Sequence, residues 1–344
     1  MRKQFGAKPT KSDVENYSKS KQWDGEKFLN IENTSMDISI RTMPKLLYKQ
    51  FCEKKDRAPK APLNIIPFNN EAFSKSSETA HFIWFGHSVL LLRMNDLTIL
   101  IDPMFGSNAA PISPFPIKRF SENTLDIIDE LPIIDLVLLS HDHYDHLDYD
   151  SIQKLKPKVK QFYVALGVKR HLIKWGIDAE IITEFDWWDT ADFNTIQITF
   201  TPTRHFSGRG LRDRAKSLWG GWSLMTPKEK IWFSGDSGYG QHFKEIGRRL
   251  GPFDFAFMEC GQYNENWSQI HMFPEESVQA AIDANVQTFM PVHWAGFALA
   301  QHSWTEPVER FIEAANKQNI KCIVPKLGEI VSIETSKTSD FWFK

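Results

Sequence analysis

From Ala80 onward the chain consists of short apolar runs separated by glycine, asparagine, aspartate and proline, a pattern typical of successive β-strands. The first runs are HFIWFG (81–86), VLLLRM (89–94) and LTILIDP (97–103). The continuous apolar run IIDLVLLS at 133–140 predicts a strand that is buried on both faces. Further strands are expected at 161–166, 196–202, 231–236, 253–259 and 288–293.

Between the later strands the apolar spacing changes to that of helices with one buried face. The segment 275–284 places Val278, Ala281 and Ile282 on one side, and 306–316 has the same kind of apolar face. Strands come first and are then interleaved with helices. This order predicts sheets that are covered by helices on the outside.

Residues 1–77 have a different composition, rich in lysine, asparagine, serine and proline, with short apolar clusters at 43–47 and 65–68. We expect this segment to be an N-terminal extension that packs on a main domain spanning 78–344. A chain of 344 residues with 42% hydrophobic content is long enough to bury one large core or two modest ones.

The overall charge and the cysteines exclude several classes of protein. A formal net charge of −2 argues against a general nucleic-acid binder. Three widely separated cysteines, Cys52, Cys260 and Cys322, form neither a disulfide framework nor a CxxC zinc motif.

The distribution of apolar residues also bears on location. No stretch approaches the ~18–20 apolar residues that span a bilayer, and the basic start MRKQFGAKPTKSD is not followed by an apolar run. We therefore expect a cytoplasmic or membrane-peripheral protein, although an export signal removed before residue 1 would be compatible with the same sequence.

The strongest chemical signal is SHDHYDHLD at 140–148, directly after the apolar strand. Zinc binds neutral histidine nitrogens and carboxylate oxygens, typically at ~2.0–2.2 Å. In a turn, His141 and His143 can point one way while Asp145 and His146 point another, so one loop can serve two metal ions. The alternatives are a solvated polar loop or a single structural site, and the HxHxDH spacing favours metal binding.

Three further strands end in residues that can bind a metal ion. The run TFTPTRH ends at His205, IWFSGD at Asp236 and TFMPVH at His293. A lone histidine at a strand end is more often a packed or capping residue. The joint pattern, together with the HxHxDH loop, predicts that all three are ligands.

This succession of HxHxDH, one histidine, one aspartate and a final histidine resembles the metallo-β-lactamase superfamily, from about His81 to the C-terminus. The resemblance implies an α/β (α+β) fold, a four-layer αββα sandwich, with two zinc ions or other first-row divalent metals at one edge. The implied ligands are His141, His143 and His205 for the first ion, Asp145, His146 and His293 for the second, and Asp236 bridging both. One major subclass of true β-lactamases has a cysteine at the position of Asp236, which speaks against antibiotic hydrolysis.

A narrower resemblance is to the N-acylphosphatidylethanolamine-hydrolysing phospholipase D family. It is carried by WFGHSVLLL (84–92), ILIDPMFG (99–106), PISPFPIKRF (111–120), CGQYNENW with HMFPEES (260–277), and PVHWAGFALA (291–300). It implies a phospholipase D-type phosphodiesterase that cleaves such phospholipids with a hydroxide bridging two zinc ions. In that mechanism Asp236 bridges the two zinc ions, and Asp145 accepts a hydrogen bond from the attacking hydroxide.

Other functions remain open at this stage. A lactonase or another ester hydrolase would use the same metal chemistry, whereas the near-neutral charge disfavours an RNA-processing nuclease. A non-catalytic binding protein is disfavoured because every ligand position is filled. We expect a small-molecule or phospholipid substrate and peripheral contact of the protein with a membrane. We expect no nucleic-acid partner, and the sequence leaves the oligomeric state open.

Several residues outside the ligand set have expected roles. Asp102, at the end of LTILIDP, is a candidate for orienting a ligand histidine, although turn chemistry before Pro103 also explains it. His87 in the WFGHS turn is expected to orient its loop. The resemblance implies that His271 lies near the substrate phosphate, as a leaving-group proton donor or phosphate contact. The alternative is a surface histidine before a helix.

A basic segment follows the strand that ends at His205. Arg209, Arg212 and Arg214 are expected to receive an anionic head group, because arginine presents a bidentate fork to phosphate. A solvated loop is the alternative. The 12 tryptophans and 26 phenylalanines suit a site for acyl chains, but they equally suit an ordinary sandwich core.

Overall fold

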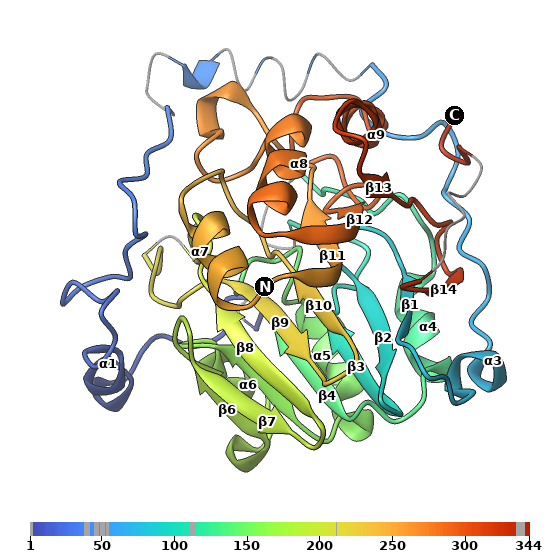
Figure 1. Ribbon diagram of the computed structural model, residues 1–344. Helices are drawn as coiled ribbons and strands as arrows, with labels where there is room; N and C mark the ends of the chain where they lie inside the picture. Colours follow the sequence, from blue (N-terminus) through green and yellow to red (C-terminus); the bar gives the residue numbers. More distant parts are fainter. Residues whose placement is uncertain are drawn as a thin grey trace.

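The structure, a computed structural model, describes residues 3–37, 42–44, 48, 52, 55–110, 115–210, 212–334 and 341–344. The predicted apolar cluster at 43–47 lies partly outside these residues, as do positions 111–114 of the motif at 111–120. Within the described residues, the chain forms two β-sheets that face each other, with helices on the outer side of each sheet (Figure 1).

The first sheet has the strand order β14-β1-β2-β3-β4-β5-β6. Its strands are β1 (His81–Trp84), β2 (Leu90–Met94), β3 (Leu97–Ile101), β4 (Leu136–Leu139), β5 (Phe162–Ala165), β6 (Ile182–Phe185) and β14 (Ile330–Ser332). The pairs from β14 to β3 are antiparallel and those from β3 to β6 are parallel. All four residues of β4 are buried, as its continuous apolar sequence predicts.

The second sheet has the order β13-β12-β11-β10-β9-β8-β7. Its strands are β7 (Thr190–Phe193), β8 (Ile196–Thr201), β9 (Gly221–Met225), β10 (Lys230–Phe233), β11 (Phe253–Glu259), β12 (Val286–Val292) and β13 (Lys321–Cys322). The strands from β7 to β10 pair antiparallel, and those from β10 to β13 pair parallel.

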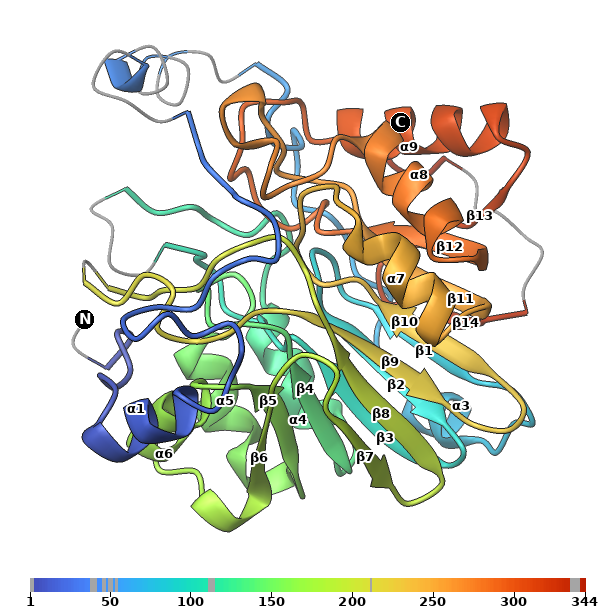
Figure 2. The ribbon, with the colours of Figure 1, turned by 60° about the vertical axis from the view of Figure 1, so that its left-hand side comes forward.

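The helices cover the outer faces of the two sheets, so the sandwich has four layers (Figure 2). Helices α4 (Ile127–Glu130), α5 (Tyr149–Leu155) and α6 (Lys169–Lys174) lie on the first sheet, and α7 (His242–Arg249), α8 (Pro274–Asp283) and α9 (Glu306–Lys317) lie on the second. Two short helices, α1 (Lys11–Tyr17) and α3 (Asn70–Ser74), precede the first strand. Short 3-10 turns occur at Thr124–Asp126, Lys156–Lys158, Ala179–Ile181 and Glu265–Trp267. The expected αββα fold class is confirmed.

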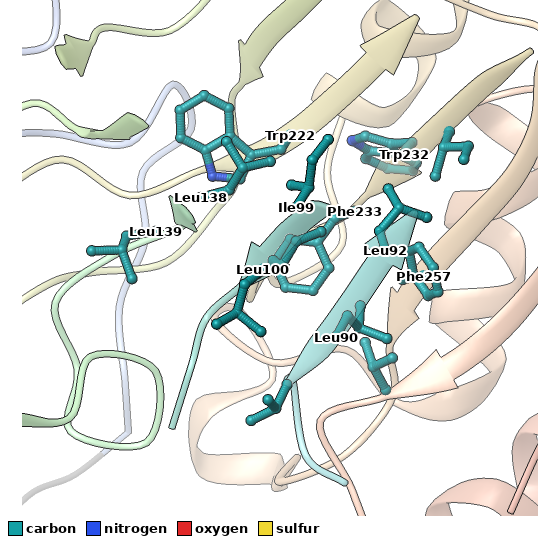
Figure 3. Packing of buried hydrophobic residues seen from close by; sticks show 14 of the residues in the cluster. Leu90, Leu92, Ile99, Leu100, Leu138, Leu139, Trp222, Trp232, Phe233 and Phe257 are labelled. Carbon is teal, nitrogen blue, oxygen red and sulfur yellow. The ribbon is translucent and has the colours of Figure 1, made fainter. Parts of the chain in front are cut away.

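The core lies between the two sheets, where apolar side chains from both inner faces meet (Figure 3). The ring of Phe82 in β1 lies with its centroid 5.4 Å from that of Phe255 and 4.9 Å from that of Phe257, both in β11. Leu92 and Ile99 belong to the same buried cluster. Such interlocking of inner faces is the usual way in which two sheets bury their apolar sides.

The predicted strands correspond to β1–β5, β8 and β10–β12, and both predicted helices are present as α8 and α9. The prediction missed β6, β7, β9, β13 and β14 and the short helices α1, α3, α4, α5, α6 and α7. Strand β7 has no buried residue, and β9 begins with a glycine, so their sequences lack the apolar alternation that identifies a strand.

The N-terminal residues contact the main domain at several points. Tyr17, Trp23 and Phe28 form an aromatic cluster with ring centroids 4.9–5.4 Å apart. The backbone N–H of Phe28 donates to the carbonyl of Ala215 at 2.9 Å. None of the helices in the described residues is both long enough and apolar enough to cross a membrane.

We predict that Phe82→Ala lowers the free energy of unfolding by about 3–5 kcal/mol, because it removes a fully buried ring and leaves a cavity between the sheets. Urea unfolding at fixed metal content measures the change. Ile133→Ala is the control: its side chain is 52% exposed, so the change should stay near 0.5 kcal/mol or less. Equal losses in the two variants would contradict this description of the core.

Candidate metal centre

The predicted ligands meet at one edge of the sandwich, because each follows the end of a strand. The loop after β4 carries His141, His143, Asp145 and His146; His205 follows β8, Asp236 follows β10, and His293 follows β12. Parallel strands bring their carboxyl ends to the same edge of a sheet, which is where α/β proteins place their sites. Residues that are more than 150 positions apart in the sequence thus become neighbours.

The first group of side chains consists of His141, His143 and His205. His141 Nε2 lies 2.9 Å from His143 Nδ1, and His205 Nε2 lies 3.2 Å from the same atom. One ring nitrogen from each residue lies within 4.8 Å of the others. Three imidazoles in this arrangement are a suitable donor set for one metal ion.

The second group consists of Asp145, His146 and His293. Asp145 Oδ2 lies 3.5 Å from His146 Nε2 and 3.8 Å from His293 Nε2. Both ring nitrogens are buried; His146 Nε2 lies near two carboxylates, whereas His293 Nε2 has no hydrogen-bond partner. An unpartnered buried polar atom costs free energy, and a cation between these three residues would remove that cost. The donor set therefore fits a metal ion here as well.

The carboxylate of Asp236 lies between the two groups. Its Oδ2 is 3.0 Å from His146 Nε2 and 3.8 Å from both His141 Nε2 and His205 Nε2. Its Oδ1 is 3.1 Å from His293 Nδ1. Asp236 thus lies within reach of both groups.

Burial and charge fix the protonation states of the cluster. Burial lowers the pKa of His141, His205 and His293 well below the usual range, which favours the neutral imidazole that binds metal ions. Burial alone would raise the pKa of Asp236, but His146 and His293 hold it well below its ordinary value. His146 differs from these three residues, because the carboxylates of Asp236, Asp145 and Asp102 raise its pKa well above the usual value against the effect of burial.

Asp102 orients His146. It accepts a hydrogen bond from His146 Nδ1 at 2.7 Å, and Ser140 donates to it through both its hydroxyl (2.6 Å) and its backbone N–H (2.8 Å). Because Nδ1 is used as a donor, Nε2 of His146 is left to face the cluster. This is the position expected for Asp102 from its place after a strand.

His87 contacts the second group from outside. It is fully buried, and its Nε2 donates to Asp145 Oδ2 at 2.9 Å. Its ring centroid lies 4.2 Å from that of His293. His87 therefore holds a ligand carboxylate in place, which is a more specific role than the loop orientation expected from the sequence.

His271 lies beside the cluster and pairs with Glu259, a residue that the sequence reasoning missed. The His271 ring is 4.9 Å from that of His205, and its Nδ1 donates to the buried Glu259 carboxylate in a short contact. Burial raises the pKa of Glu259 to about 8, and Glu259 in turn raises the pKa of His271 against the effect of burial. The pair therefore retains a proton next to the cluster. Glu259 ends strand β11, the same signal that identified His205, Asp236 and His293.

The three arginines after His205 occupy different environments. Arg209 is buried, donates to the carbonyls of Asp142 and Leu147 at 2.7 Å each, and stacks on Tyr144. It braces the HxHxDH loop, so the expected role of receiving a substrate anion does not match its position.

Arg212 and Arg214 are both exposed. The guanidinium of Arg214 lies 3.9 Å from the ring centre of Phe206, which in turn lies 4.5 Å from the ring of His143. Arg214 is therefore at the rim of the cluster. No contact between Arg212 and a ligand residue occurs in the described part of the chain.

Comparisons with known proteins agree with this architecture. The sequence pattern of the beta-lactamase superfamily domain matches residues 98–294. The chain is 35% identical over 309 residues to an uncharacterized protein of Mycobacterium bovis, covering 88% of this chain and 82% of the relative. It shares its fold with a metallo hydrolase from the archaeon Ignicoccus hospitalis, with a TM-score of 0.58 and 20% identity over 75% of this chain and 99% of the other.

A named relative is N-acyl-phosphatidylethanolamine-hydrolyzing phospholipase D 1 of Caenorhabditis elegans. It is 32% identical over 265 residues, which cover 72% of this chain and 74% of the relative. The superfamily match, this identity and the histidine and aspartate cluster at the edge of the sandwich lead to one assignment. The chain is a metal-dependent hydrolase of the β-lactamase superfamily and belongs to the family of the N-acyl-phosphatidylethanolamine-hydrolysing phospholipases D.

Proposed function

We propose that the protein is a binuclear zinc phosphodiesterase of the phospholipase D type that acts on N-acylphosphatidylethanolamine-like phospholipids. The observation that carries this proposal is the position of Asp236 between two separate groups of ligands, with the proton-holding pair of His271 and Glu259 beside them. The activity printed in the name of the Caenorhabditis elegans relative supports the choice of substrate.

Zinc ions held by these ligands would supply an activated water and would neutralise charge on the phosphoryl oxygens. The protein's own groups then control orientation and protons. Asp145, held by His87 at 2.9 Å, can accept a hydrogen bond from the attacking water. His271 uses Nδ1 to bind Glu259, so its Nε2 is the atom that can donate a proton to the leaving oxygen.

An apolar cavity behind Phe297 supports a lipid substrate. It has a volume of about 750 Å³ and is lined by Phe115, Ile117, Phe120 and Ala298 together with Lys118 and Arg119. The Arg119 guanidinium is buried, and its Nε and one terminal nitrogen have no hydrogen-bond partner. Apolar walls with a few polar groups suit a ligand with an acyl chain and an anionic head group.

Phe297 and His87 lie between this cavity and the metal ligands. The Arg119 guanidinium lies 5.0 Å from the ring centre of Phe297, and that ring lies 5.2 Å from the ring of His87. At its mouth, Phe115 is 60% exposed and Lys60 and Lys118 line the wall. An exposed aromatic side chain between lysines is suited to contact with an anionic lipid surface. We therefore propose that the protein meets the membrane through this mouth.

We predict that purified protein binds close to two zinc ions per chain and that Asp236→Ala loses much of this metal together with activity. The reason is that Asp236 contacts both ligand groups. Elemental analysis after gel filtration measures the ratio. Asp150→Ala is the control, since Asp150 is an exposed carboxylate on α5. Folded parent protein that cannot be loaded with any first-row divalent metal would refute the binuclear centre.

We predict that the parent hydrolyses a phospholipid phosphodiester faster than a lactone or RNA. We also predict that His271→Ala lowers kcat for an alkyl phosphodiester by about 10²–10⁴-fold. Metal content should remain at the parent value. A nitrophenyl leaving group needs no proton, so the activity of the variant toward a nitrophenyl phosphodiester should fall much less. Equal losses for both leaving groups would show that His271 is not the proton donor, and faster cleavage of the lactone or RNA would refute the phospholipase D-type assignment.

We predict that Arg214→Glu raises KM for an anionic phospholipid about tenfold, because a charge-assisted contact of about 1.5 kcal/mol is replaced by repulsion. The effect should shrink at high salt, since Arg214 is partly exposed. Arg212→Glu is the matched control, with the same change of charge two residues away. If both variants change KM equally, the effect is a general one of net charge and Arg214 is not a substrate contact.

A further inference from the structure

We propose that Asn30, in the N-terminal extension, is a positioning residue for the ligand His205 and thereby for the first metal group. Its side-chain Nδ2 donates to the backbone carbonyl of His205 at 2.8 Å. The backbone N–H of His205 donates back to Asn30 Oδ1 at 3.0 Å. One amide thus binds both backbone groups of His205, in the way that a neighbouring β-strand would.

His205 needs such a partner because it lies beyond the end of β8 and pairs with no strand. A buried backbone N–H and carbonyl are costly unless they are hydrogen-bonded. His205 Nδ1 donates to the carbonyl of Ile270 at 2.9 Å, which leaves Nε2 facing His143. The ring and the backbone of His205 are therefore fixed by separate contacts, and Asn30 supplies the backbone contacts.

The orientation of the Asn30 amide is also determined. Trp219 Nε1 donates to Asn30 Oδ1 at 3.0 Å, so this oxygen accepts from two N–H donors. The nitrogen must then be the atom that faces the His205 carbonyl. Trp219 is buried, and its indole therefore fixes the amide in the orientation that His205 requires.

The residues after Asn30 connect His205 to the loop that carries His271. The Ser35 backbone N–H donates to the Gln269 side-chain oxygen at 2.9 Å. Arg204 donates to the same oxygen at 3.1 Å and to the backbone carbonyl of Asn33 at 2.8 Å. The segment 30–37 therefore joins two loops that approach the cluster from different strands. It fixes the position of His205 relative to His271, whose ring lies 4.9 Å away.

The proposal concerns the metal centre alone and does not depend on a phospholipid substrate. Partners of metal ligands typically change metal affinity by 10–100-fold when they are removed. A segment that only stabilises the fold would instead lower the unfolding midpoint and leave metal affinity unchanged. Metal retention and unfolding therefore distinguish a positioning residue from a structural one.

The test uses the full chain loaded with cobalt(II), whose visible absorption reports the ligand geometry, and a competing chelator. Asn30→Ala should retain one ion about 10–100-fold more weakly than the parent and should change the cobalt spectrum. Asn33→Ala is the matched control, because Asn33 contacts Arg204 through its backbone carbonyl, which the substitution keeps. Unfolding midpoints are measured on metal-free protein.

A second pair of variants separates position from charge. Asn30→Asp places an oxygen against the His205 carbonyl, so it should also weaken retention, although an added negative charge by itself would strengthen it. Asn33→Asp adds the same charge nearby without touching His205. The proposal is overturned if each Asn30 variant retains both ions as tightly as the matching Asn33 variant. Failure of both Asn30 variants to fold would overturn it as well, in favour of a structural role.

Discussion

The free-energy cost of burying charged and polar groups is the constraint on which this structure depends. One edge of the sandwich gathers the imidazoles of His141, His146, His205 and His293 around the carboxylate of Asp236, nearly all out of contact with water. Such a cluster is stable only if every polar atom finds a partner. The Nε2 atom of His293 has no hydrogen-bond partner, so protein atoms alone do not satisfy the cluster. The chemistry of the site and its stability therefore both point to a cation.

A second set of residues surrounds the ligands and fixes the orientation of their side chains. Asp102 orients His146, His87 holds Asp145, and the carbonyl of Ile270 orients the ring of His205. Arg209 belongs to this set, since it donates hydrogen bonds to two backbone carbonyls of the HxHxDH loop. Because Arg209 is buried, it stabilises this loop, although the sequence predicted that it would bind an anionic head group at the surface. Metal sites generally depend on such outer partners as strongly as on the ligands.

Other residues near the cluster have a different character. His271 and Glu259 retain a proton beside it, Arg214 lies over Phe206, and an apolar cavity with a buried arginine lies beyond Phe297 and His87. A metal centre of this kind can hydrolyse many bonds, so fold and ligands do not select the substrate. The residues around the centre have to do so.

The sequence by itself determined the fold class and predicted which histidines and aspartates gather at one edge of the sandwich, because both depend on local patterns. An apolar run followed directly by a histidine or aspartate marks a strand end, and parallel strand ends share one edge of a sheet. Glu259 carries the same signal at the end of β11 and could have been found in this way. The tertiary structure alone decided the order of the strands, the burial of Arg209 and the contact between Asn30 and His205, which are 175 positions apart. These features depend on which segments meet in space, and no local spacing of residues records that.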